Sequence, residues 1–278
     1  MSTLTKKEKK LQSILASYKR VVIGFSGGID STLVLKEAIN SLGKENVLAV
    51  VANSELFSDD EYDKAIKLAD ELGAQVKGVE LDYLADEHVK NNKPNSWYYM
   101  KQMFYAKLME IAKDFNTDVV LDGMIMDDAS DFRPGLRARD EAGAVSVLQQ
   151  ADIYKDEVRQ LSQKLGLKNW NKIPSCSVSS RFPYNTELTS AKLNQVLTAE
   201  KYLREQGFMT VRVRVHEDMA RIEVPEKEIV NLIAKKTAIT EELNKIGYKY
   251  VTVDLQGFVS GRMNQELSEE EKLNILVG

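Results

Sequence analysis

A glycine-rich loop directly after a short apolar run is the feature of this chain that most restricts its fold. Residues 21–25, VVIGF, have the composition of a strand that is buried on both faces. Residues 26–31, SGGIDS, follow at once and open a helix with an apolar stripe that includes Leu35, Ala38 and Leu42. A buried strand that runs through glycines into a helix is typical of a parallel α/β sheet.

The chemistry of this loop favours a bound anion. Gly27 and Gly28 have no Cβ, so the backbone can approach a ligand closely, and bare N–H groups at a helix N-terminus attract negative charge. Ser26 and Ser31 add hydroxyl donors, and Asp30 can hold a metal ion carried by phosphates. The loop has neither the lysine of GxxxxGK[ST] nor the spacing of GxGxxG, so it predicts a phosphate site of another kind. The alternative is a tight turn with a serine cap.

The rest of the first half alternates strand and helix. Leu11, Ile14 and Leu15 have helical spacing near the N-terminus. Short apolar runs predict further strands over 47–52, 75–81 and 118–121. Periodicity and capping signals predict helices over 58–73, 98–114 and 155–165. Interleaved elements of this length predict a parallel sheet with helices on both faces.

The second half has a different pattern. A long helix near residues 193–203 precedes two alternating runs, 211–216 and 220–224, which form a hairpin around Glu217 and Asp218. A helix after Pro225 and a strand over 250–255 complete a small α+β domain. We therefore expect an α/β domain over 1–170, a linker over 171–186 and the small α+β domain over 187–278.

Composition excludes several classes of function. The chain has 278 residues, and 38 basic against 42 acidic side chains give a net charge of −4, which disfavours nucleic acid as a partner. No apolar run approaches the roughly 18 residues of a membrane span. The single cysteine allows no intrachain disulfide, and no signal peptide begins the sequence. These features predict a cytoplasmic protein without a membrane partner.

A second group of polar residues follows the strand over 118–121. Asp122 and Gly123 end this strand, and Asp127, Asp128 and Arg133 come soon after. Ligands of open parallel sheets bind at the carboxyl ends of the strands. Gly123 and Arg133 are therefore candidates for nucleotide binding, since arginine pairs well with phosphate, and the carboxylates could hold Mg²⁺. A polar loop with a Pro-Gly turn is the alternative for each residue.

The lone cysteine, Cys176, lies in the linker within the hydroxyl-rich stretch CSVSSRF. A single cysteine is most often an inert, small apolar side chain. Here hydroxyl groups such as that of Ser180 surround it, and the cation of Arg181 is nearby, which would lower the pKa of a thiol. This setting favours a nucleophile.

The first alternating run places Arg212, Arg214 and His216 on one face and valines on the other. Three donors on one face suit a phosphate or carboxylate ligand. From these residues alone, a solvated face paired with Glu223 on the neighbouring strand is the simpler interpretation.

With these motifs in hand, SGGIDS resembles the PP-loop of the ATP pyrophosphatase superfamily. Its members use ATP and Mg²⁺ to transfer AMP to an oxygen of the substrate, and a nucleophile then displaces AMP. The resemblance implies that Ser26, Gly27, Gly28, Asp30 and Ser31 bind ATP, with Asp30 as the metal ligand.

The later motifs narrow the resemblance to the LarE family of sacrificial sulfur insertases, which help to make the nickel-pincer nucleotide of lactate racemase. CSVSSRFPY, RVRVHEDMARIEV and DLQGFVSGRMN occur in the order of that family, and the resemblance covers almost the whole chain. It implies a pyridinium dicarboxylate mononucleotide as substrate. It also implies a homo-oligomer, specifically a hexamer.

The resemblance assigns roles to named residues of this chain. Cys176 would attack the adenylated carboxylate, form a thioester and give up its sulfur, which leaves dehydroalanine and a thiocarboxylate product. Trp97 would stack on the pyridinium ring. The remaining candidates for binding the substrate are Ser180, Arg181, Glu200, Arg212 and Arg214.

One departure from the family pattern concerns iron. Many members have a CxxC motif where this chain has Trp97 and Met100, and those cysteines with a third are thought to hold an iron–sulfur cluster. A cluster needs several thiolates. With one cysteine we expect no iron–sulfur cluster here, and Cys176 itself would supply the sulfur.

Three other functions fit part of the pattern. One is a PP-loop amidotransferase or synthetase with a nitrogen nucleophile, for which Cys176→Ala would keep full activity. Another is a tRNA thiolase, which one cysteine and a net charge of −4 disfavour. The third is a non-catalytic sensor that binds adenine nucleotide without releasing pyrophosphate.

Overall fold

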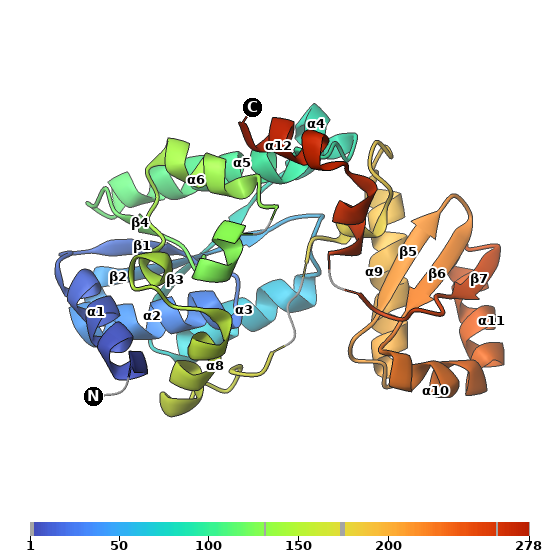
Figure 1. Ribbon diagram of the computed structural model, residues 1–278, viewed down its shortest axis with the longest axis horizontal. Helices are drawn as coiled ribbons and strands as arrows, with labels where there is room; N and C mark the ends of the chain where they lie inside the picture. The colour runs from blue at the N-terminus through green and yellow to red at the C-terminus, as the bar shows by residue number, and fades with distance from the viewer. Residues whose placement is uncertain (1–2, 131, 173–175, 260, 278) are drawn as a thin grey trace. The chain divides into compact units, whose positions relative to one another are not determined.

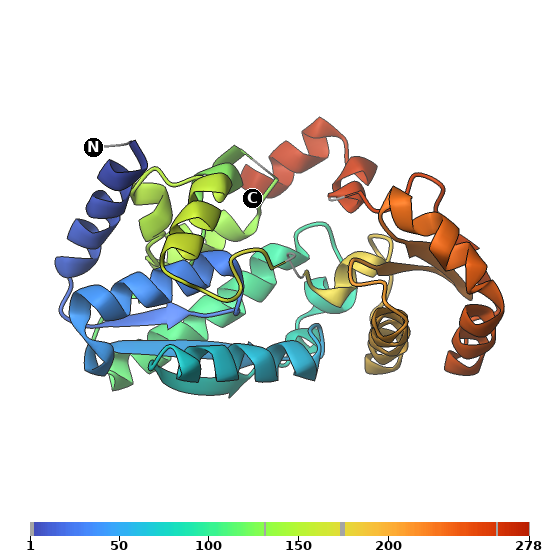
Figure 2. The same ribbon diagram turned by 90° about the horizontal axis from the view of Figure 1, so that it is seen from below.

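The computed structural model describes residues 3–130, 132–172, 176–259 and 261–277, and Figures 1 and 2 show it from two sides. The chain divides into two compact units. The first contains residues 1–83, 97–175 and 276–278, and the second contains residues 84–96 and 176–275. Each unit is described by itself below. The predicted boundary at 170–187 did not anticipate that segment 84–96 packs with the second half of the chain.

The first unit is built on a four-stranded parallel sheet with strand order β3-β2-β1-β4. Its strands are β1 Val21–Gly24, β2 Val47–Asn53, β3 Gln75–Glu80 and β4 Val120–Leu121. The chain moves outward from β1 through β2 to β3 and then returns to the other side of β1 for β4. The carboxyl ends of β1 and β4 therefore border the point where the strand order reverses, which is where open α/β sheets bind ligands.

Helices cover both faces of this sheet (Figure 1). They are α1 Thr3–Ala16, α2 Ile29–Leu42, α3 Asp59–Glu71, α5 Ser96–Asp114, α6 Gly135–Ala142, α7 Val147–Gln150 and α8 Lys155–Lys164. Val21 and Ile23 of β1 pack in one core with α1, α2, α3 and α8. Val22 points the other way, into a second core with α5. This alternation explains why every residue of β1 up to Ile23 is apolar and confirms the predicted α/β fold.

The second unit is a small α+β domain. Its sheet has the order β5-β6-β7, with β5 Arg212–His216 antiparallel to β6 Met219–Glu223, and β7 Tyr250–Val253 parallel to β6. The helices are α4 Glu87–Lys90, α9 Ser190–Glu205, α10 Ile229–Ala234 and α11 Lys236–Ile246, and the chain ends with α12 Glu269–Val277. The hairpin around Glu217 and Asp218 is confirmed, and Glu217 adopts a φ of +54° to close it.

No helix among the described residues is long and apolar enough to cross a membrane.

Candidate functional site

The loop after β1 is shaped to receive an anion. Gly27 has a φ of +65°, and a Cβ there would lie 3.0 Å from that of Ala65, so the turn needs glycine. The hydroxyls of Ser26 and Ser31 lie 3.2 Å apart, and the N–H of Gly28 donates to the Ser26 hydroxyl at 3.3 Å. No side chain caps α2, whose first-turn N–H groups therefore point to the loop without a capping partner.

Asp30, in the first turn of α2, contacts a lysine that comes from a different part of the chain. The ammonium of Lys155, at the start of α8, lies 2.6 and 2.9 Å from the two carboxylate oxygens of Asp30. Burial raises the pKa of Asp30 above its ordinary value, although the charge of Lys155 and its hydrogen bond pull it down. The motif lacks a lysine of its own, and the fold supplies one from residue 155. The sequence analysis did not identify this residue.

A second cation also lies against the loop. Lys172 Nζ and Asn169 Nδ2 each donate to the carbonyl oxygen of Gly27 at 3.2 Å, and Asn169 also donates to the hydroxyl of Thr32 at 2.9 Å. Both residues come after α8; Asn169 lies at the end of the predicted first domain and Lys172 at the beginning of the predicted linker. They too were absent from the sequence-based candidates, because nothing in their local pattern indicates the contact.

Gly123 brings the end of β4 against the PP-loop helix. A Cβ at this position would lie 2.6 Å from the backbone nitrogen of Ser31 and 2.9 Å from its Cα. Only glycine permits that approach, while the role of Gly123 in nucleotide binding remains a prediction. Asp122 beside it is buried and accepts hydrogen bonds from the hydroxyls of Tyr105, at 2.6 Å, and Ser146, at 2.7 Å. Its carboxylate therefore stabilises the edge of the sheet and is not free for a metal.

The carboxylates after β4 are partly engaged. Asp128 forms an ion pair with Arg133 at 2.9 Å, and Asp127 accepts the backbone N–H of Lys155 at 2.9 Å. The described residues contain no group of three or more His, Cys, Asp and Glu side chains arranged for a metal. Mg²⁺ commonly binds through one or two carboxylates together with substrate phosphates. Asp30, with Asp128 close enough to raise its pKa, fits that requirement when phosphates are present.

Cys176 is exposed and precedes the short 3-10 helix η4, Val178–Arg181. The hydroxyls of Ser177 and Ser179 lie 2.7 Å apart, and the Ser177 hydroxyl accepts the N–H of Ser179, which starts this turn. Buried Asn92, from the segment before α5, donates to the carbonyls of Phe182 and Pro183 at 3.2 and 3.0 Å. Asn92 has a φ of +46° and was not among the sequence-based candidates.

Arg181 holds the backbone of this loop. Its Nη1 donates to the carbonyl oxygens of Cys176, at 3.2 Å, and Ser177, at 3.0 Å. Its Nε and Nη2 form a buried bidentate pair with Glu200 on α9, at 2.8 and 3.1 Å. Burial works to raise the pKa of Glu200, but the charge and hydrogen bonds of Arg181, together with the charge of Arg212 and the N–H of Val213, lower it overall. The charge of Arg181 is thus already balanced, and the pair acts on Cys176 through the backbone.

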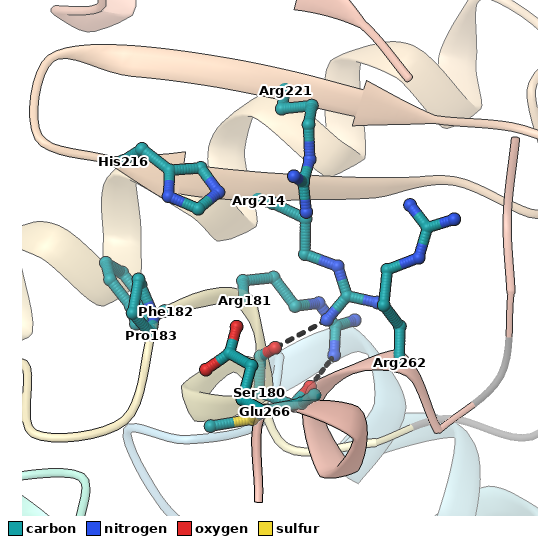
Figure 3. A pocket seen from close by; sticks show the side chains of 10 residues that line it. Ser180, Arg181, Phe182, Pro183, Arg214, His216, Arg221, Arg262 and Glu266 are labelled. Carbon is teal, nitrogen blue, oxygen red and sulfur yellow. Dashed lines mark hydrogen bonds between the residues drawn. The ribbon is translucent and has the colours of Figure 1, made fainter. Parts of the chain in front are cut away.

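The donor face predicted for the hairpin exists, and a pocket lies beside it (Figure 3). Arg214 and His216 line this pocket with Ser180 and Arg181, and the structure adds Arg221 and Arg262, which were not among the sequence-based candidates. Arg214 donates to the carbonyl of Ser180 at 2.6 Å and to the fully buried Glu223 at 2.9 Å, while its Nε has no partner. Burial and the charge of Arg221 lower the pKa of His216, which favours its neutral form.

The remaining two sequence-based candidates are Arg212 and Trp97. Arg212 lies over the ring of Phe258, 5.3 Å from its centroid, and burial among cations such as Arg181 lowers its pKa. Trp97 is half-buried at the start of α5, where the chain passes from the second unit to the first. Its predicted contact with a pyridinium ring remains a prediction.

Comparison with known proteins agrees with this geometry. The family model described as NAD synthase matches residues 4–236. Pyridinium-3,5-bisthiocarboxylic acid mononucleotide synthase of Lactiplantibacillus plantarum is 57% identical over 271 residues, which are 98% of each chain. The chain belongs to the LarE family. Its likeness to that family, inferred above from the motifs, is confirmed.

Two further proteins are similar to this chain to a lower degree. An uncharacterized protein of Synechocystis is 37% identical over 96% of this chain and 100% of its own length. The NH(3)-dependent NAD(+) synthetase of Fusobacterium nucleatum is 27% identical over 55% of this chain and 60% of its own.

Proposed function

We propose that this LarE-family chain is an ATP-dependent sulfur transferase that adenylates a carboxylate of pyridinium-3,5-dicarboxylate mononucleotide and replaces it with a thiocarboxylate. The observation that carries the proposal is Cys176. It is the only cysteine of the chain, it is exposed, and it lies in a loop held on several sides, in a chain 57% identical to a synthase of a bisthiocarboxylic acid mononucleotide.

The nucleotide half of the reaction uses the PP-loop. Ser26, Gly27, Gly28 and Ser31 offer hydroxyl and backbone N–H donors for the phosphates of ATP. Mg²⁺, held by Asp30, would neutralise charge on the phosphates during AMP transfer. Lys155, now paired with Asp30, supplies a cation at the same place, and Arg133 is a further candidate near Asp128.

Sulfur transfer takes two steps, formation of a thioester and elimination of its sulfur from Cys176. The thiolate of Cys176 attacks the acyl-adenylate, so that a C–S bond forms, the C–O bond to AMP breaks, and AMP leaves. A base then removes the Cα proton of Cys176, the electron pair forms a Cα–Cβ double bond, and the Cβ–S bond breaks. The product leaves as a thiocarboxylate and residue 176 becomes dehydroalanine.

The substrate phosphate would bind in the pocket of Figure 3. Ser180 and Arg214, two of the sequence-based candidates, meet there with His216, Arg221 and Arg262. Guanidinium groups bind phosphate with two parallel hydrogen bonds. Arg212 stands on the same strand face, while Arg181 lines the pocket, pairs with Glu200 and shapes the loop.

The mass of the intact protein tests this function. Incubation with ATP, Mg²⁺ and substrate should lower it by one H₂S per thiocarboxylate formed. Cys176→Ser is the control: it should release pyrophosphate but form no thiocarboxylate. Thiocarboxylate production with an unchanged protein mass would refute sacrifice of Cys176.

A second candidate function follows from the match with NAD synthase. A PP-loop enzyme with ammonia as nucleophile would also adenylate a carboxylate, and the NAD(+) synthetase of Fusobacterium nucleatum resembles this chain over 55% of its length. Amide formation that survives Cys176→Ala would favour this function. Nucleotide binding without pyrophosphate release, for every carboxylate tried, would instead indicate a sensor.

Three wider expectations are also part of the proposal. The protein would assemble as a homo-hexamer, would work in the cytoplasm, and would take a small molecule as its substrate without nucleic acid or membrane. Light scattering of the purified protein measures the first directly.

A further inference from the structure

We infer that Asn169 and Lys172 are positioning residues that anchor the start of the cysteine-bearing loop to the PP-loop. Both side chains donate to the carbonyl oxygen of Gly27, at 3.2 Å each, and Asn169 also reaches the Thr32 hydroxyl at 2.9 Å. The contacts themselves do not depend on the proposed function. Their role does, because the anchor would bring the Cys176 thiol to the adenylated carboxylate.

The contacts form one unit. The backbone N–H of Lys172 donates to the carbonyl of Asn169 at 2.9 Å, so the two residues are held at a fixed spacing. Thr32 is fully buried and donates to the carbonyl of Gly28 at 2.7 Å. The two side chains thus reach both glycines of the loop, Gly27 directly and Gly28 through Thr32.

The short stretch of chain from Lys172 to Cys176 limits how far the thiol can lie from the anchor. Cys176 follows Lys172 by four residues, and an extended chain spans at most about 3.5 Å per residue, so its Cα lies within about 14 Å of that of Lys172. Confinement to a sphere of that radius corresponds to an effective concentration of roughly 0.1 M. This bound follows from the covalent chain and holds for any arrangement of the two units.

Without the anchor the tether would be longer. The preceding firm contact is Leu167, which is 4% exposed and donates its N–H to the carbonyl of Ser162 at 2.9 Å. Cys176 follows it by nine positions, so the limit that this stretch of chain sets on the reach grows to about 32 Å and the effective concentration falls by at most about tenfold. The anchor should therefore change how often the thiol meets the PP-loop ligand without changing the thiol itself.

A thiol-reactive ATP analogue, with a haloacetyl group on the terminal phosphate, measures this proximity without any sulfur transfer. At saturating analogue, Cys176 of the Asn169→Ala/Lys172→Met variant should be alkylated more slowly than in the wild type, by up to about tenfold, after correction for its rate with free iodoacetamide. A variant with arginine in place of methionine at position 172, Asn169→Ala/Lys172→Arg, should recover part of the alkylation rate. Lys168→Met is the matched control, because Lys168 is exposed and forms an ion pair with Glu71 at 2.8 Å instead of a bond to Gly27, and its rate should not change.

Single-turnover kinetics then connect the anchor with the reaction. The ratio of the rate constant for thiol loss to that for pyrophosphate release should fall by up to about tenfold in the double variant, whatever adenylation itself loses. Equal alkylation rates in wild type and double variant would overturn the inference. Slower alkylation together with no sulfur transfer in the wild type would instead refute the proposed function and leave the anchor standing.

Discussion

Lys155 Nζ lies 2.6 and 2.9 Å from the two carboxylate oxygens of Asp30, although 125 residues separate them in the sequence. The pair brings together the first turn of α2 and the first turn of α8 at the carboxyl edge of the sheet. Under the proposed function Lys155 would balance the charge of Asp30 and would offer a cation to the phosphates of a bound nucleotide.

Loss of this lysine should shift the pH dependence of adenylation. Burial raises the pKa of Asp30, and Lys155 opposes that rise. Under the proposed function Asp30 would have to be ionised to hold Mg²⁺, so activity should fall as pH drops through its raised pKa. Lys155→Met should move this acid limb to higher pH, while Lys155→Arg should keep it in place. Pyrophosphate release measured from about pH 5 to pH 8 checks the shift, and identical acid limbs would contradict the role given to the pair.

Gly123→Ala should impair adenylation more than stability. Its Cβ would meet the backbone of Ser31 at 2.6 Å, and backbone cannot move aside as a side chain can, so the end of β4 must withdraw from the PP-loop. We expect at least a tenfold loss of pyrophosphate release, or about 1.4 kcal/mol in the activation free energy.

Gly143→Ala separates this effect from general destabilisation. Gly143 has a φ of +71° and open space around its Cβ position, so alanine there costs about 1 kcal/mol of folding free energy without touching the loop. Equal losses of activity in the two variants would show that the approach of Gly123 to Ser31 does not matter.

Removal of only one partner of the buried pair of Arg181 and Glu200 should lower the free energy of unfolding. Glu200→Ala leaves the guanidinium of Arg181 buried and without its carboxylate, which typically costs about 3–5 kcal/mol. The double variant Arg181→Met/Glu200→Met should be more stable than Glu200→Ala. Urea denaturation measures both, and a single variant as stable as the wild type would contradict the burial of this pair.

The same pair gives stability a defined pH dependence. The pKa of Glu200 is lower in the folded state than its ordinary value. Its contribution is therefore complete above the unfolded pKa, about 4.5, and is lost as pH falls through the folded value. The wild type should lose more free energy of unfolding on acidification over that range than Arg181→Met/Glu200→Met does.

Glu37 should behave in the opposite way. It is fully buried in α2, and burial, with the charge of Glu8, raises its pKa despite a hydrogen bond from Gln12. Its stabilising neutral form is present below the unfolded pKa and is lost as pH rises. Glu37→Gln should therefore raise the stability by about 1 kcal/mol near pH 8 and by less near pH 4.5. Thermal unfolding at the two pH values checks the sign.

Much of the architecture could be predicted from local pattern. Alternation in β5, the apolar run of β1 and the SGGIDS motif each depend on residues close in the chain, where periodicity and glycine chemistry are direct signals. The segment 84–96 could not be predicted in this way, because the side chain of Asn92 has its hydrogen-bond partners about ninety residues away. No short-range pattern marks such a contact.

The sequence alone determined the strand-loop-helix unit that we expect to bind phosphate, the position of the single thiol, and the donor face of the hairpin, since each follows from composition and spacing within a few residues. Tertiary structure decided which distant charges join them: Lys155 at Asp30, Lys172 and Asn169 at Gly27, and Glu200 at Arg181. The reason is that strand order, with β4 returning beside β1, fixes which loops meet at the sheet edge. Partners of a buried or half-buried charge are then set by which elements pack together, and not by their neighbours in the chain.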